Sequence, residues 1–272
     1  MAIPQVQLDP IYSLPYLYIS GLNISVPVVS GGTSTLLAIA PGACRDSSNN
    51  IDMEVGFANL QGNVNAAPII INTAVVGANG IDAGALAASQ LYSVYLIADS
   101  RGYLPVAGIV SLSSNAMPLL PLGYDSLRLL GFVGTSAGSV FTTASVLNAV
   151  NAKTFYLSPP TSVLAGGNAT TFTAIDMTPP LPASPAMGIV LLTVNYTPAA
   201  VGNNVQFRYA GSADTSGLVT VSGLAAAVPQ QNQVQVVYVA SATANVEYKV
   251  SSASDAVTVL VSGWTIDTVS VA

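Results

Sequence analysis

The sequence lacks histidine altogether, and only 7% of its 272 residues are Asp, Glu, Lys or Arg. A soluble domain typically carries about 25% of these charged residues. Proton transfer, nucleophile activation and transition-metal binding depend mainly on imidazole groups and on clusters of ionisable side chains. We therefore predict no catalytic, cofactor-binding or metal-binding residue, and we expect that the protein is not an enzyme.

Cysteine is nearly absent, because Cys44 is the single one. One thiol cannot form a disulfide within its own chain, and a nucleophilic cysteine would need a base such as histidine. Cys44 is therefore predicted to be a small, buried, apolar side chain.

Long apolar runs are also missing, although the mean hydropathy of +0.59 is high. Runs such as residues 68–71 and 188–194 end after a few positions, whereas a membrane-spanning helix needs about 20 apolar residues. Residues 1–10 have neither the basic nor the apolar segment of a secretory signal. We expect no insertion into a membrane.

Positive charge is scarce and dispersed, and the net charge is −6. A protein that follows a nucleic-acid backbone needs a basic patch or stripe. The six basic residues here stand singly, and nucleic acid is therefore not expected as a partner. They are Arg45, Arg101, Arg128, Lys153, Arg208 and Lys249.

Short alternating runs of apolar and polar residues make up most of the chain, and they predict an all-β fold. The strongest strand signal is residues 90–99 (QLYSVYLIAD), which place Tyr92, Val94 and Leu96 on one face. After residue 160, about seven or eight short strands alternate with Gly, Asn, Pro and Ser, as a β-sandwich or jelly roll requires. Residues 84–90 (GALAASQ) are a weak candidate for a helix.

Three regions are predicted along the chain: an N-terminal attachment arm (1–32), a β-rich module (33–155) and a C-terminal β-sandwich or jelly roll (156–272). The arm is rich in proline, which lacks an N–H donor and cannot continue a central strand or a helix. Its tyrosines, Tyr12, Tyr16 and Tyr18, are the candidate docking residues. The alternatives are a ragged terminus and an edge strand of the chain's own domain.

Two short motifs suggest chemistry but are better explained by turns. Residues 134–138 (GTSAG) match a nucleophile elbow, which needs a histidine base and a following helix. Ser136 is therefore predicted to be a turn residue. Asp46, Asn49 and Asp52 could offer oxygens to calcium, but the glutamate of an EF-hand loop is missing. Side chains that cap loop amides are the favoured explanation.

Because charges are so few, each one is expected to have a specific structural role. Asp125 with Arg128, and Arg45 with Asp46, are close enough in sequence to pair locally. A buried, hydrogen-bonded arginine that fixes a loop is the favoured interpretation, and a salt bridge between subunits is the alternative. The predicted loop-fixing residues are Arg45, Asp46, Asp82, Asp125 and Arg128.

Two further alternatives concern sugars. The twelve acidic residues show no pattern that marks the acid–base pair of a glycoside hydrolase, although only a fold can bring such a pair together. Trp264 and Tyr196 are predicted to be core aromatics, and stacking platforms for sugars are the alternative.

Three segments of the first half occur in a telling order. They are residues 38–56 (AIAPGACRDSSNNIDMEVG), 79–103 (NGIDAGALAASQLYSVYLIADSRGY) and 120–135 (LPLGYDSLRLLGFVGT). Together they contain R-D-S-x-N, G-x-D-x-G and L-P-x-G-Y-x-x-x-R. This succession resembles a module of tailed-bacteriophage virion proteins over about 100 residues. The second half resembles, in texture only, the β-sandwich modules of phage fibres.

The resemblance implies a structural virion protein that carries no known catalytic residues. Several of its residues stand at recurrent positions of the module, namely Arg45, Asp46, Asp82, Tyr95, Tyr124 and Arg128. It also implies a homotrimeric tail-fibre or appendage/connector protein in the virion, which is an extracellular particle assembled in the host cytoplasm. Its expected partners are copies of itself and other capsid, neck or tail proteins, with a host surface receptor as a further candidate.

Other functions remain open beside this one. A receptor-binding adhesin would use the C-terminal sandwich to bind a host saccharide or protein. A capsid decoration protein, of the cement or head-fibre type, would stiffen the shell. An enzyme is the least supported alternative.

Overall fold

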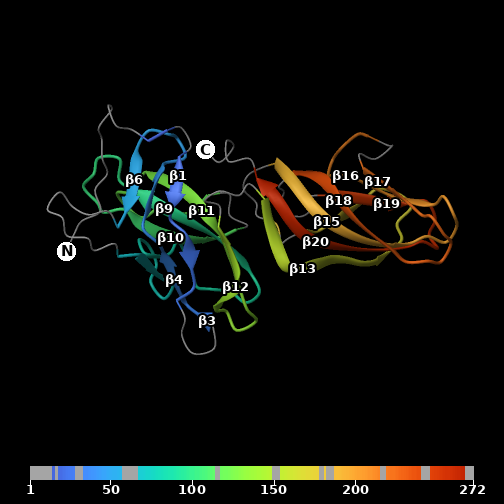
Figure 1. Cartoon of the computed structure of the whole chain (residues 1–272), viewed down its shortest axis with the longest axis horizontal. Coiled ribbons are helices and arrows are strands. Elements are labelled where there is room, and N and C mark those ends of the chain that lie inside the picture. Colours follow the sequence, from blue (N-terminus) through green and yellow to red (C-terminus); the bar gives the residue numbers. More distant parts are fainter. Residues whose placement is uncertain are drawn as a thin grey trace. The chain divides into compact units, whose positions relative to one another are not determined.

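The computed structural model describes residues 14–15, 18–27, 33–56, 67–113, 117–148, 154–177, 181, 187–214, 219–239 and 246–266. The regular secondary structure within these residues consists of β-strands alone, numbered β1 to β20. This confirms the prediction of an all-β fold. The chain divides into two compact units (Figure 1). Unit 1 comprises Met1–Lys153 with Thr268–Ala272, and unit 2 comprises Thr154–Asp267.

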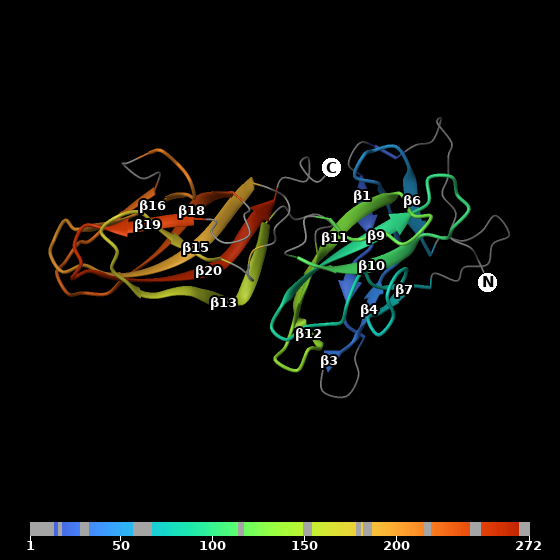
Figure 2. The ribbon, with the colours of Figure 1, turned by 180° about the vertical axis from the view of Figure 1, so that it is seen from behind.

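Unit 1 contains three sheets. A six-stranded sheet has the order β3 (Thr33–Ser34), β12 (Phe141–Asn148), β11 (Ser126–Thr135), β9 (Leu91–Ala98), β10 (Ala107–Leu112) and β8 (Gly80–Ile81). One three-stranded sheet joins β1 (Ile19–Gly21), β5 (Gly42–Arg45) and β6 (Asp52–Val55). The other joins β2 (Ile24–Ser25), β4 (Leu36–Ile39) and β7 (Ile69–Asn72). Figure 2 shows β9, β10 and β11 at the centre of the unit.

Strand β9 is the centre of the unit 1 core. It confirms the strand predicted at residues 90–99, and all eight of its residues are buried. Tyr92, Val94 and Leu96 belong to one hydrophobic cluster that draws on all three sheets. Gly108 of β10 makes the approach of β7 possible, because a Cβ there would lie 2.6 Å from Cδ1 of Ile71. Both faces of β9 are therefore covered within one domain.

The described part of the predicted arm is integrated into unit 1. Strands β1 and β2 are the edge strands of the two three-stranded sheets, and Leu22 and Ile24 are fully or nearly fully buried. The described residues of this stretch follow the alternative of edge strands in the chain's own domain. Leu22, Ile24 and Val26 occupy alternate positions, and all three bury apolar area. This burial explains why the stretch forms edge strands of unit 1. Tyr12 and Tyr16 lie outside the described residues.

The helix considered at residues 84–90 is not formed. These residues make bends and a turn between β8 and β9. The N–H of Ala87 donates to the Tyr92 hydroxyl at 2.7 Å, and the N–H of Ser89 donates to the Ser136 carbonyl at 3.0 Å. These tertiary hydrogen bonds replace the helical ones.

Unit 2 is a sandwich of two four-stranded sheets (Figure 1). The first has the order β13 (Thr154–Gly167), β20 (Ala256–Ile266), β15 (Met187–Thr197) and β18 (Gln230–Val239). The second has the order β14 (Thr173–Ile175), β19 (Val246–Val250), β16 (Asn204–Tyr209) and β17 (Val219–Ser222). Pro159 and Pro160 lie in β13, an edge strand, where the register against β20 shifts. Edge strands and irregular registers are where sheets accept proline.

The pairing of the strands in unit 2 is nested. The first strand of the unit pairs with the last (β13 with β20), the second with the seventh, the third with the sixth, and the fourth with the fifth. Each of these pairs is antiparallel. An eight-stranded chain that folds in this way across two sheets is a jelly roll. The structure therefore selects the jelly roll from the two predicted sandwich forms.

Alternating strands build the core of unit 2. Val257, Val259 and Val261 of β20 point inward and are fully buried, as is Trp264 of the same strand. The Trp264 ring stacks on Phe155 with 5.6 Å between ring centroids. Tyr196 is fully buried as well. The prediction that Trp264 and Tyr196 are core aromatics is confirmed.

Replacement of Trp264 tests whether this residue holds unit 2 together. We expect Trp264→Ala to lower the free energy of unfolding of unit 2 by about 3–5 kcal/mol, because the vacated volume cannot close. Tyr156→Ala, on the adjacent β13, is the matched control because Tyr156 is 67% exposed. Differential scanning calorimetry of the full chain would measure both variants, and equal shifts in the two would contradict this account of the core.

Candidate functional site

Arg45 holds the N-terminal stretch onto the β5–β6 hairpin. Its Nη1 donates to the Leu14 carbonyl at 2.8 Å and its Nη2 donates to the Asn49 carbonyl at 2.6 Å. Its Nε lies 3.5 Å from the carboxylate of Asp52, which in turn accepts the Leu14 N–H at 3.0 Å. The local pair expected with Asp46 is thus replaced by an ion pair with Asp52. The cause is the hairpin register, in which Arg45 and Asp52 are cross-strand partners.

Asp46 is a buried cap for the loop between β5 and β6. One carboxylate oxygen accepts the N–H groups of Asn50 and Ile51 at 2.6 and 2.9 Å, and the other accepts the N–H of Ser48 at 3.2 Å. Asn49 adopts the left-handed conformation (φ 58°) that closes the loop. The arrangement confirms the predicted capping of loop amides.

Arg128 and Cys44 lie beside this loop and are buried. Burial lowers the pKa of the Arg128 guanidinium, and Cys44 and Asp46 counteract that shift. Burial also raises the pKa of the Cys44 thiol to about 12, although the Arg128 charge opposes this. A thiol with such a pKa stays protonated near neutral pH and is a poor nucleophile. The prediction of a buried, apolar Cys44 is confirmed.

Asp82 and Asp125 fix two further loops of unit 1. Asp82 is buried and accepts hydrogen bonds from the Ser111 hydroxyl at 2.6 Å and the Leu119 N–H at 3.2 Å. Asp125 accepts the N–H and the hydroxyl of Ser100 at 2.8 and 2.6 Å. The five residues predicted to fix loops therefore do not form one cluster. Arg45, Asp46 and Arg128 lie at the β5–β6 loop, whereas Asp82 and Asp125 serve two other connections of the same unit.

Two loop-fixing carboxylates escaped the sequence analysis. Asp99, fully buried, accepts from the Arg101 backbone N–H and from its Nε at 3.0 and 2.9 Å. The hydrogen bond from the Arg101 side chain is the main reason that the pKa of Asp99 is lowered. The D-S-R-G turn around Asp99 is a local signal that could have indicated this role.

Asp255 is the second loop-fixing carboxylate that the sequence analysis did not predict. It is buried in unit 2 and accepts from the Tyr196 hydroxyl (3.0 Å) and from Nδ2 of Asn203 (2.8 Å). It also accepts the N–H groups of Ala199 (2.7 Å) and Ser252 (3.0 Å). Burial alone would raise the pKa of Asp255, but these hydrogen bonds hold it below its usual value. Most of its donors are distant in sequence, so no local pattern predicts the site.

A further cluster lies on the outer face of β16 and β19 in unit 2. Nε of Arg208 donates to Glu247 at 2.6 Å, and the Arg208 guanidinium lies 3.8 Å from the centroid of the Phe172 ring. Lys249 approaches the same ring at 4.7 Å. Two of the chain's cations are thus engaged by one aromatic side chain, which is a stabilising arrangement.

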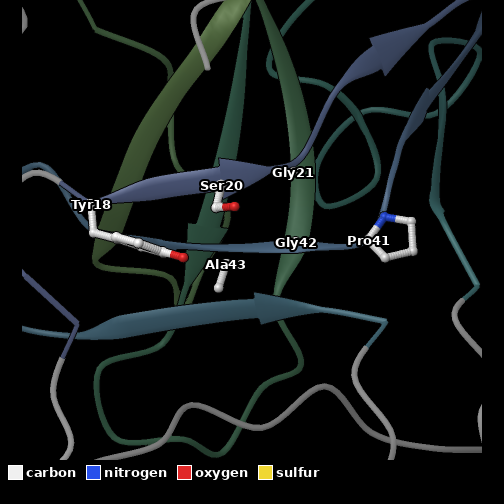
Figure 3. Close-up of a pocket in the computed structure, with 6 residues that line it drawn as sticks. All are labelled: Tyr18, Ser20, Gly21, Pro41, Gly42 and Ala43. Carbon is white, nitrogen blue, oxygen red and sulfur yellow. The ribbon is translucent and has the colours of Figure 1, made fainter. Parts of the chain in front are cut away.

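A shallow hollow of about 250 Å³ lies between β1 and β5 (Figure 3). Its lining residues are Tyr18, Ser20, Gly21, Pro41, Gly42 and Ala43. A Cβ at Gly21 would lie 2.4 Å from the Pro41 carbonyl oxygen, so glycine is required for this close approach of the two chains. The hollow offers hydroxyl and backbone groups, and its lining side chains include no carboxylate, thiol or amine. These residues offer hydrogen bonds together with apolar contact from Tyr18, Pro41 and Ala43.

Two absences concern the residues that the structure describes. No group of three His, Cys, Asp or Glu side chains in this part of the chain could hold a metal ion. No helix among these same residues has the length and hydropathy that crossing a membrane requires.

Ser136, in the predicted nucleophile-elbow match, is a turn residue. Its hydroxyl accepts the Gly138 N–H at 3.1 Å, which confirms the prediction.

Comparison of the chain with protein-family models, with curated proteins and with solved structures finds no match.

Replacement of Asp255 tests the role of its carboxylate. We expect Asp255→Ala to lower the unfolding free energy of unit 2 at pH 7 by roughly 3 kcal/mol, because buried donors lose a charged acceptor. A lowered folded-state pKa contributes stability that is present above the unfolded pKa of about 3.9 and is lost as the pH falls through the folded pKa. The difference between wild type and variant should therefore shrink below about pH 4.

Urea unfolding followed by the fluorescence of Trp264, the single tryptophan, measures this effect in the full chain. Ser254→Ala, at an exposed position of the same loop, is the matched control and should unfold like wild type. A difference between wild type and Asp255→Ala that is the same at every pH would disprove the proposed role of the charge.

Proposed function

We propose that the chain is a non-enzymatic structural component of a tailed-phage virion, a trimeric tail-fibre or appendage/connector protein. Its N-terminal region docks on the particle, and its jelly roll contacts neighbouring proteins or projects from the particle.

The observation that carries the proposal is that the basic side chains serve the chain's own structure. Five of the six basic residues lie in the described part. Arg45, Arg101 and Arg208 form ion pairs with Asp52, Asp99 and Glu247, respectively. Arg128 is buried and interacts electrostatically with Asp46, and Lys249 contacts the Phe172 ring. A protein that binds a charged substrate would keep such groups available in a cleft.

The three motifs of the first half support the proposal through their positions. R-D-S-x-N forms the capped loop at Asp46, G-x-D-x-G carries the buried Asp82, and L-P-x-G-Y-x-x-x-R contains Asp125 and Arg128. Each motif thus specifies a structural connection of unit 1. Motifs that specify loops are expected in a structural module that recurs in different proteins, rather than in a catalytic site.

The jelly roll of unit 2 supports the proposal more weakly. Jelly rolls build viral capsid domains, and they also build lectin domains and cupins. One fold serves many functions. It is compatible with a structural role and with a receptor-binding role.

The oligomeric state of the purified full chain tests the proposal. Mass photometry is expected to show particles with three times the mass of one chain. The physical reason is that a chain with so little surface charge has few groups that keep copies apart in solution. A stable, soluble monomer at micromolar concentration would contradict the trimeric function, and so would turnover of a polysaccharide that is lost on mutation of one Asp or Glu.

A receptor-binding adhesin is a second candidate, favoured by one observation. Loops of unit 2 expose Val201, Leu224 and Val228, and hydrogen bonds between Pro198 and Ala227 and between Gly202 and Gly223 join these loops. Asp255 holds Ala199 and Asn203 at the base of the same group. Rigid, apolar loop tips are suitable for contact with a receptor.

Substitution at these tips separates the two functions. Val201→Ser with Leu224→Ser should abolish binding of the labelled chain to the bacterium that propagates the particle if unit 2 is an adhesin, because the apolar contact is removed. Particle assembly should be unchanged. Retention of binding, measured by flow cytometry, would disprove the adhesin candidate.

A further inference from the structure

Three loops of unit 1 expose an unusual amount of apolar surface. The exposed fractions reach 99% for Leu122 and 81% for Tyr103. The six side chains of this surface, here termed the apolar rim, are Val75, Val76, Tyr103, Met117, Leu119 and Leu122. None of them carries a charge at neutral pH.

Contacts between the loops place the residues of the apolar rim in neighbouring segments. A Cβ at Gly77, next to Val76, would lie 4.0 Å from Cγ of Pro121. A Cβ at Gly123 would lie 2.7 Å from Cδ1 of Leu104, which follows Tyr103. The Tyr124 hydroxyl donates to the Pro105 carbonyl at 3.0 Å and so joins the same two loops. The loops at residues 73–79, 100–106 and 117–125 are therefore neighbours.

The loops are also held in place from within. Asp82 accepts the Leu119 N–H, and Asp125 accepts the N–H and the hydroxyl of Ser100. Carboxylates thus fix the backbones of two of the three loops, and in the third the Asn72 side-chain oxygen accepts the Ala74 N–H at 3.1 Å. A preorganised surface loses less conformational entropy when it binds a partner.

The apolar rim is as large as the apolar patches that often have a function. With about 60–120 Å² of apolar area for an aliphatic side chain and about 150–250 Å² for tyrosine, the six expose on the order of 500 Å². The largest apolar patch on a typical monomer measures roughly 300–600 Å² and is often functional. Two copies that contact each other through the rim would bury about 1,000 Å², which is the area that a specific interface needs to reach.

Charge favours a second copy of the chain as the occupant. Each chain carries a net charge of −6, so copies repel one another unless they meet through neutral surfaces. The six side chains of the apolar rim are neutral, and the adjacent cation, Arg101, lies 5.6 Å from the Tyr103 ring centroid. The Arg101 side chain is 60% exposed, and its charge is balanced by Asp99 at 2.9 Å. The carboxylate next to the apolar rim belongs to Asp125, and it accepts a hydrogen bond from the Ser100 hydroxyl. A partner recognised by charge would find little to bind here.

We propose that the apolar rim is the surface through which copies of this chain contact one another about the rotation axis of the oligomer. This inference rests on the proposed function, which expects a homo-oligomer, and it adds the location of the contact. Self-contact about an axis closes the assembly and leaves no rim free for further copies.

A double substitution tests the location. Leu119→Ser with Leu122→Ser removes two exposed leucines and should raise the dissociation constant of the oligomer by roughly 100-fold or more, given the apolar area lost. Val201→Ser with Leu224→Ser is the matched control, because it removes similarly exposed side chains from unit 2. Sedimentation velocity over a range of concentrations measures the constants, and circular dichroism verifies that each variant is folded.

A cross-linking variant gives an independent readout that does not depend on the strength of the contact. Leu122→Cys places one reactive thiol on the apolar rim, while the native Cys44 is fully buried. A short bismaleimide should join two Leu122→Cys chains into a covalent dimer on a denaturing gel. Leu224→Cys is the control and should remain monomeric on the gel.

The outcomes separate the two proposals. Dissociation by the Leu119/Leu122 variant alone, together with cross-linking at position 122 alone, supports the inference. An oligomer that survives this substitution, or that cross-links only at position 224, overturns the inference and leaves the proposed oligomeric function standing. A wild-type chain that is monomeric at all concentrations overturns both.

Discussion

Hydrogen bonding from loop amides to buried carboxylates is the interaction on which this molecule most depends. A chain of short strands has many connections, and the N–H groups that leave a sheet must find acceptors. Asp46, Asp82 and Asp255 each accept at least one such N–H while buried. A charged acceptor makes these bonds strong, and the low dielectric of the interior makes them stronger still. The few charges therefore determine the shape of the loops.

This inward use of charge leaves many apolar side chains on the surface of the described residues. Four basic residues sit in ion pairs or against an aromatic ring, and the apolar rim of unit 1 and the loop tips of unit 2 expose valine, leucine and tyrosine. Neutral surfaces of this kind are suited to lasting contact between proteins, because burying them removes apolar area from water without stranding a charge. The scarcity of charged residues thus underlies both the internal hydrogen bonding of the loops and the tendency of the surface to bind other proteins. The proposed virion role uses both.

Local sequence patterns predicted much of the secondary structure and part of the site. Alternation identified β9, and the D-S-S-N-N segment correctly indicated that Asp46 caps its own loop. The partner of Arg45 was not predictable in this way, because Asp52 faces it only through the register of the β5–β6 hairpin. Asp255 was missed for a similar reason, since Tyr196 and Asn203 reach it across more than fifty residues. Contacts with long sequence separation leave no local trace.

By itself, the sequence determined the all-β class, the burial of Cys44 and Trp264, and the lack of imidazole chemistry, because composition and period-2 alternation act residue by residue. Only the tertiary structure decided that residues 19–26 join unit 1, and that unit 2 pairs its first strand with its last to form a jelly roll. It alone brought three loops with exposed apolar side chains next to one another. The physical reason is that strand pairing and loop packing depend on the whole set of competing long-range contacts, which no short window of sequence contains.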